Sequence, residues 1–311
     1  MTLPIVVRRA VALGVLAALV LTAGCSEPAD PAGQAGVRSP MSSSPLRPSI
    51  STPLTPPAEP PEGLITPTGK PVETVQPSPL ESVGAACLTK AERRGIVTFR
   101  SRPGATLAGA VLGSGPSGVV IVHRSRSDLC NSLPYGRHLA SRGHHVLVFD
   151  LGGNGSSGYV RYDEAATALA FDVAAAATAL RTYGARRVVV IGVGGGAVAT
   201  LTAATFATPA FTGVVGISCA DRHFGLDARA AVKRLPNLPL LLVAAADDHT
   251  YDGETQNLYR LAVSRNKRLM IVPGDRYGEI MFEHGIADPS NPYAVRDAVD
   301  AFVARYAGPP G

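Results

Sequence analysis

The chain has 311 residues, a formal net charge of +5 and no tryptophan. Two of its arginines, Arg8 and Arg9, stand near the N-terminus, and no basic run interleaved with aromatic residues occurs anywhere. A nucleic-acid-binding surface is therefore not expected, because such surfaces cluster lysine and arginine. We also expect no metal ion and no cofactor.

The first 25 residues have the pattern of an export signal. Arg8 and Arg9 precede an apolar stretch, Ala10–Ala23, that is shorter than the roughly 20 residues needed to span a bilayer. The stretch "LTAGC", which ends at Cys25, resembles the lipobox of bacterial lipoproteins, with Thr22 where leucine is more usual. The resemblance implies a diacylglycerol on Cys25 and a place on the outer face of the cell membrane. The alternative is an ordinary cleaved signal with a chance cysteine.

Residues 26–82 are expected to form a disordered linker. The chain has 26 prolines, and they are concentrated between Pro28 and Pro79 in a segment rich in Ser, Thr, Ala and Gly. Such a composition buries too little apolar surface to offset the entropy lost on ordering. Residues 83–308 are then long enough for one folded domain with a substantial core.

Three cysteines follow Cys25, namely Cys87, Cys130 and Cys219. In an oxidising compartment two of them can pair. We favour Cys87 with Cys130, because the first precedes the first predicted strand and the second follows the third, so that a bridge would hold the N-terminal edge of the domain. Cys219 is then expected to be a buried thiol.

Eight strands alternate with helices along the predicted domain. Two short strands, Ile96–Ser101 and Leu107–Gly113, alternate polar and apolar residues as an antiparallel edge hairpin does. Six uniformly apolar strands follow, ending at His123, Asp150, Gly192, Ser218, Ala245 and Gly274. The helices between them are expected near residues 133–142, 163–183, 195–207, 227–234, 253–263 and 292–306. Apolar strands alternating with helices predict a mostly parallel sheet covered on both faces.

This order of elements resembles the α/β-hydrolase superfamily, and within it the exported dienelactone-hydrolase-like proteins. "VIVHR" at residues 120–124 is similar to the strand that ends in His-Gly in this family, although Arg124 replaces the glycine. "DLGGNGSSG" at residues 150–158 fits the pattern that closes the next strand. The resemblance implies an eight-stranded α/β-hydrolase fold, and the short segment between Cys219 and Pro239 predicts no large lid.

The family's nucleophile elbow, G-x-S-x-G, corresponds to "GVGGG" at residues 192–196. This alignment places Gly194 at the nucleophile position, and glycine has no oxygen with which to form an acyl-enzyme. The retained acid position is Asp247, with Asp248 beside it. Tyr277 stands where the catalytic histidine is expected, and a tyrosine is a poor general base near neutral pH. Asp247 could instead hydrogen-bond Tyr277, and His284 could reach the site only by chance.

The oxyanion hole is made of backbone N–H groups, so it can survive these losses. The resemblance assigns it to Gly195 and Ser125, next to Arg124. The start of the helix at Gly195 favours an anion there. We therefore expect a lipid-anchored protein that lacks serine-hydrolase activity and binds a small molecule, a cell-envelope component or a partner protein.

Two other functions are weighed against this one. The first is an active esterase with a displaced nucleophile, for which the loop serines Ser125, Ser127, Ser156 and Ser157 are candidates, although no histidine is obviously placed to activate them. The second is nucleotide binding, because Gly192, Gly194 and Ala197 fit G-x-G-x-x-A and Asp221 follows the next strand. Four strands precede this glycine motif, whereas the dinucleotide fingerprint usually follows the first strand of its unit.

Overall fold

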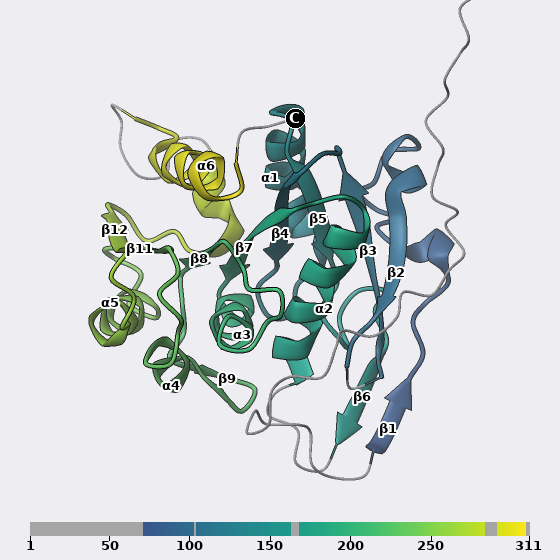
Figure 1. Cartoon of the computed structure of the whole chain (residues 1–311), viewed down its shortest axis with the longest axis horizontal. Helices are drawn as coiled ribbons and strands as arrows, with labels where there is room; N and C mark the ends of the chain where they lie inside the picture. Colours follow the sequence, from purple (N-terminus) through teal and green to yellow (C-terminus); the bar gives the residue numbers. More distant parts are fainter. Residues whose placement is uncertain (1–70, 103, 163–167, 284–290, 309–311) are drawn as a thin grey trace, which may run out of the picture. The chain divides into compact units, whose positions relative to one another are not determined.

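An eight-stranded sheet forms the centre of the domain (Figure 1). The structure is a computed structural model that describes residues 71–102, 104–162, 168–283 and 291–308. In spatial order the strands are β12 (Lys267–Val272), β11 (Leu240–Ala245), β8 (Gly213–Ile217), β7 (Arg187–Val193), β4 (Ser117–Val122), β5 (His145–Phe149), β3 (Thr106–Leu112) and β2 (Ile96–Arg100). The β2–β3 and β3–β5 pairs are antiparallel and the others are parallel, which confirms the predicted sheet with its antiparallel edge.

Helices cover both faces of this sheet. They are α1 (Leu129–Ser141), α2 (Ala168–Thr182), α3 (Gly195–Ala203), α4 (Ala228–Val232), α5 (Asp252–Leu261) and α6 (Ala294–Tyr306). One apolar cluster joins the sheet to α2, α3, α4 and α5, and a second joins its other face to α1 and α6 (Figure 1). Strands β4, β8 and β11 are buried along their whole length, which explains why their sequences are apolar without alternation.

Helix α1 begins four residues earlier than the sequence suggested. The carboxylate of Asp128 accepts a hydrogen bond of 2.9 Å from the N–H of Cys130 and so caps the helix at Leu129. Pro134 lies inside the helix, although proline is usually tolerated only in the first turn, which is why the helix was predicted to begin later. The capping side chain therefore decides this boundary.

The described structure also begins earlier than the expected domain boundary at residue 83. Strand β1 (Pro71–Val75) pairs antiparallel with β6 (Tyr159–Tyr162), and the 3-10 helix η1 (Leu80–Ser82) follows it. The Ser78 N–H then donates to the Ser156 carbonyl over 3.0 Å. The prolines around "PVETV" give this segment the composition of a linker, and for this reason the short strand was not predicted. Residues 1–70, which include Cys25, lie outside the described part of the chain.

Cys87 and Cys130 form a disulfide, as predicted, with 5.7 Å between their Cα atoms. An ion pair supports the same edge of the domain. The Arg137 guanidinium donates to the Cys87 carbonyl over 2.7 Å, and its Nε lies 2.7 Å from a carboxylate oxygen of Glu92. The Arg137 hydrogen bond lowers the pKa of Glu92 to about 2. Cys219 is a buried thiol, also as predicted, and burial raises its pKa.

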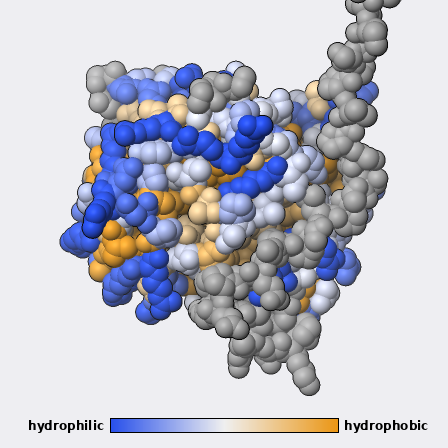
Figure 2. Space-filling view, in the orientation of Figure 1, coloured by the Kyte–Doolittle hydropathy of each residue, from blue (hydrophilic) through white to orange (hydrophobic). Residues whose placement is uncertain are grey.

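The surface mixes polar and apolar side chains on the face drawn in Figure 2. Among the described residues, six large apolar side chains are exposed: Val75, Leu80, Phe224, Val263, Ile271 and Tyr277. No helix in this part of the chain combines the length and the apolarity needed to cross a membrane. Phe224 and Tyr277 lie next to residues of the candidate site.

Candidate functional site

The turn between β7 and α3 has the shape of a nucleophile elbow. Gly194 occupies it with φ 54° and ψ −120°, and its N–H donates to the Ile217 carbonyl over 2.9 Å. A positive φ is strained for residues that carry a Cβ and is readily adopted by glycine. The chain therefore keeps the strand–turn–helix geometry of the elbow, with a residue that has no side chain at the nucleophile position.

Arg124, which pairs with Glu279, lies next to Gly194. A Cβ added to Gly194 would lie 3.1 Å from the Cβ of Arg124. One carboxylate oxygen of Glu279 accepts from the Arg124 backbone N–H over 3.0 Å, and the other accepts from Nε over 3.1 Å. Glu279 is 9% exposed and Arg124 39%. Glu279 thus holds both the backbone and the guanidinium group of Arg124.

Tyr277, the predicted position of the histidine, is exposed and lines the same cavity as Arg124. Its side chain is 48% exposed, and its ring centroid lies 5.9 Å from that of Tyr251. The next residue, Gly278, is the one that lies against Arg124, because a Cβ there would be 3.3 Å from the Arg124 Cδ. Neither residue 277 nor residue 278 supplies a base to the elbow. His284 lies outside the described residues.

The predicted acid, Asp247, is exposed at the end of β11, and its N–H donates to the Gly274 carbonyl over 2.9 Å. Asp248 is the buried one of the two, and one of its oxygens accepts from the N–H groups of Thr250 and Tyr251. Within the described residues no hydrogen bond joins either carboxylate to Tyr277. The structure therefore does not show the suggested contact between Asp247 and Tyr277, and both side chains are exposed.

The partner of Ser125 was not predicted from the sequence. Its hydroxyl is hydrogen-bonded to Nε2 of His223, which belongs to β9 (Arg222–His223) in a two-stranded hairpin with β10 (Leu226–Asp227). A Cβ on Gly195 would overlap both Ser125 Oγ and the His223 ring, so the pair lies directly against the start of α3. Burial lowers the pKa of His223, which favours the neutral imidazole.

The two predicted oxyanion donors lie beside this pair. Gly195 is the first residue of the nine-residue helix α3. In the part of the chain that the structure describes, its N–H and that of Ser125 have no acceptor. A helix N-terminus carries a partial positive charge, so both groups can receive a carbonyl oxygen or a carboxylate.

The other residues that carried the family resemblance hold loops in place. The Asp150 carboxylate accepts from the N–H groups of Leu129 and Ser156, over 2.7 and 2.8 Å. His123 is buried, with Nδ1 2.7 Å from the Arg124 carbonyl and Nε2 accepting from the N–H of Leu151 over 3.0 Å. Burial lowers its pKa. These groups position the loop that carries Arg124 and Ser125.

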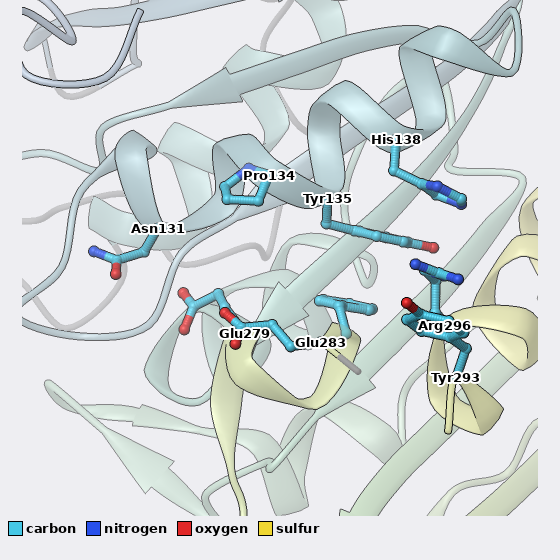
Figure 3. A pocket seen from close by; sticks show the side chains of 9 residues that line it. Asn131, Pro134, Tyr135, His138, Glu279, Glu283, Tyr293 and Arg296 are labelled. Carbon is cyan, nitrogen blue, oxygen red and sulfur yellow. The ribbon is translucent and has the colours of Figure 1, made fainter. Parts of the chain in front are cut away.

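Two cavities share Asn131, Glu279 and Glu283 in their linings. The first, of about 440 Å³, is lined by Arg124, Asn131, Asp275, Arg276, Tyr277, Glu279, Ile280 and Glu283. The second, of about 270 Å³, lies between α1, the 3-10 helix η3 (Gly278–Phe282) and the start of α6 (Figure 3). There Tyr135 stacks on Phe282 and donates to Asp300 over 2.8 Å. The first cavity opens beside Arg124 and is therefore the one next to the elbow.

Replacing Gly194 by alanine is expected to lower the free energy of unfolding by about 1–2 kcal/mol. The alanine must adopt a positive φ and bring its Cβ to 3.1 Å from that of Arg124. Urea unfolding measures the change. The matched control is Gly253→Ala on α5, where an added Cβ meets nothing within 4 Å and should slightly stabilise the helix. An unchanged Gly194→Ala variant would contradict the described turn.

Comparisons with known proteins agree at the level of the fold. No family model and no curated protein matches the chain. The Pyrococcus furiosus esterase Pf2001 superposes with a TM-score of 0.58 at 17% identity, covering 78% of this chain and 100% of the esterase. A thermophilic esterase from Thermogutta terrifontis, solved with malate bound, gives 0.56 at 16% identity, with coverages of 68% and 98%. A monoacylglycerol lipase from Paleococcus ferrophilus gives 0.51 at 17%, with coverages of 64% and 99%. Together with the strand order, these likenesses show that the chain has the α/β-hydrolase fold.

Proposed function

We propose that this chain is an exported, lipid-anchored protein of the α/β-hydrolase fold that binds a small carboxylate or carbonyl compound at the start of α3. In this proposal residue 194 takes no part in nucleophilic catalysis. The observation that carries it is the elbow itself, which keeps its backbone geometry around a residue without a side chain, with the Cβ of Arg124 3.1 Å from where a Cβ of residue 194 would lie.

The ligand class follows from the donors that remain. The N–H groups of Gly195 and Ser125 have no acceptor among the described residues, and they lie at the positive end of α3. A carbonyl or carboxylate oxygen satisfies both donors at once. The cavity of about 440 Å³ is lined by Arg124, the chain neighbour of Ser125, but not by Ser125 or Gly195 themselves.

Acetate and malate are suitable probes, and isothermal titration calorimetry is the measurement. We expect dissociation constants on the order of 1 mM, since a small anion held by two N–H groups gains only about 4 kcal/mol. Gly195→Ala should abolish binding, because its Cβ would overlap Ser125 Oγ and His223. Gly253→Ala is the control that should bind as the wild type does. Equal binding by the Gly195 variant, or none by the wild type, would overturn the assignment of the site.

The anchor is tested separately, by fractionating cells that express the full chain. The motif "LTAGC" supports lipid attachment at Cys25. We expect the wild type in the membrane fraction and labelled by radioactive palmitate, and the Cys25→Ala variant unlabelled and released from the membrane. A wild type that takes up no label, or a Cys25→Ala variant that is labelled as the wild type is, would exclude a lipid on Cys25.

A further inference from the structure

Ser125 and His223 are separated by 98 residues in the sequence and meet over the first turn of α3. The serine belongs to the loop that follows β4, and the histidine to the β9–β10 hairpin that follows β8. Both are half-buried, so they are shielded from bulk water yet reachable. A hydroxyl hydrogen-bonded to an imidazole nitrogen is the contact by which an activated nucleophile is recognised, wherever it lies in the fold.

The backbone next to each member of the pair is strained. Arg126, directly after Ser125, has φ 56°, and Phe224, directly after His223, has φ 44°. A positive φ is uncommon for any residue other than glycine, and a two-residue hairpin turn such as Phe224-Gly225 usually begins with Asn, Asp or Gly. Strain of this kind persists where the surrounding structure enforces it, and it clusters at functional sites.

Phe224 also gives the site an apolar wall. Its side chain is 67% exposed, and its ring centroid lies 4.2 Å from that of His223. An exposed aromatic ring in a strained turn contributes nothing to the core of the domain. It can contact an apolar group of a ligand whose polar end is held at Gly195.

We infer that Ser125 is a nucleophile and His223 its general base, and that together they cleave small esters with an apolar acyl or alcohol group. The inference rests on the proposed function in one respect, since the ester carbonyl occupies the same place as the bound carboxylate. The Gly195 N–H and the N–H of Ser125 itself then receive the oxygen that becomes negative in the transition state. Gly194 has no role beyond shaping the turn.

The reaction is balanced without any further reactant than water. Ser125 Oγ attacks the carbonyl carbon while its proton passes to His223 Nε2. The bond to the alkoxy group breaks, His223 returns the proton to the leaving alcohol, and the acyl group remains on Ser125 as an ester. Water then attacks this ester and gives its proton to His223, the bond between the acyl carbon and Ser125 Oγ breaks, and His223 returns the proton to Oγ as the carboxylic acid leaves.

The histidine lacks one feature of a full triad. Within the described residues no carboxylate is hydrogen-bonded to Nδ1 of His223. An unsupported histidine is a weaker base, so slow turnover with accumulation of the acyl-enzyme is expected. Covalent labelling is therefore a more sensitive readout than turnover.

The test uses the folded wild-type protein with a fluorophosphonate probe, followed by peptide mass spectrometry. We expect the probe on the peptide that contains Ser125, no labelling of Ser125→Ala, and labelling slowed by about 100-fold in His223→Gln. Ser141→Ala, which removes an exposed hydroxyl at the end of α1, is the matched control and should label as the wild type does. Circular dichroism shows whether each variant is folded.

A second measurement follows hydrolysis of p-nitrophenyl acetate by the same variants, with the mass of the intact protein recorded during the reaction. A wild type that gains one acetyl group, and a Ser125→Ala variant that does not, would support the inference. Absence of any label on the wild type, or a label on Ser127 instead, would overturn it. Acetate binding retained by Ser125→Ala would show that the proposed binding function stands even if the covalent one fails.

Discussion

Replacing both Cys87 and Cys130 by serine is expected to lower the free energy of unfolding by about 4 kcal/mol. The bridge spans 43 residues of sequence, and this loop-closure entropy is regained by the unfolded chain when the bond is absent. Guanidinium unfolding of the wild type and the double variant measures the difference. The wild type in excess reductant should unfold at the same midpoint as the double variant.

The thiol of Cys219 does not interfere with the comparison between the reduced wild type and the double variant. Cys219 is fully buried, and burial raises its pKa, so it neither exchanges with the bridge nor reacts with reagents in the folded state. A loss below about 1 kcal/mol in the double variant would mean that the Arg137–Glu92 ion pair alone holds this edge in place.

The second large effect is on the pH dependence of stability and concerns Asp172 in α2. This side chain is 2% exposed, and burial raises its pKa to about 6 from 3.8, although the Gly152 N–H donates to it over 3.0 Å. The folded state thus holds a proton that the unfolded chain releases near pH 3.8. The contribution of Asp172 to the free energy of unfolding is therefore fully present below about pH 3.8. It is lost as the pH rises through about 6, and the total loss is about 3 kcal/mol.

Asp172→Asn should remove this slope, because an amide can accept the Gly152 N–H without being charged. Urea unfolding between about pH 4 and about pH 7 measures how the free energy of unfolding depends on pH. The variant should be more stable than the wild type only near the upper end of this pH range. Asp297→Asn, an exposed carboxylate on α6, is the control that should keep the wild-type slope. Parallel curves for wild type and Asp172→Asn would show that this carboxyl is already ionised in the folded protein.

The sheet and the elbow could be predicted from the sequence because their signals are local. Runs such as "VVVIGV" before Gly194 are apolar on both faces, as buried parallel strands must be. The glycines at 192, 194 and 196 mark a turn in which the backbone is closely approached by other atoms, so that there is no room for side chains. The disulfide followed from the positions of two cysteines relative to the predicted strands.

The contacts that give the site its chemistry could not be found in this way. Glu279 meets Arg124 across 155 residues, and no sequence period links them. His223 lies in a strand of two residues, too short for any pattern of alternation. The dipeptide Phe224-Gly225 was the one available signal of a hairpin there, and phenylalanine is not a residue typical of that turn.

The bridge at Cys87 also has a mechanical meaning if the chain is held at Cys25. A force applied from the anchor would reach the described domain at β1, which is paired with β6, and only the part that this pair does not bear passes along residues 76–86 to the bridge. From Cys87 the load divides, and a covalent bond carries part of it into α1. The edge strand β2, which pairs on one side only, is thereby spared from bearing the whole load. Reduction of the bridge would shift that load onto the β2–β3 pair and make the sheet edge the first part to yield.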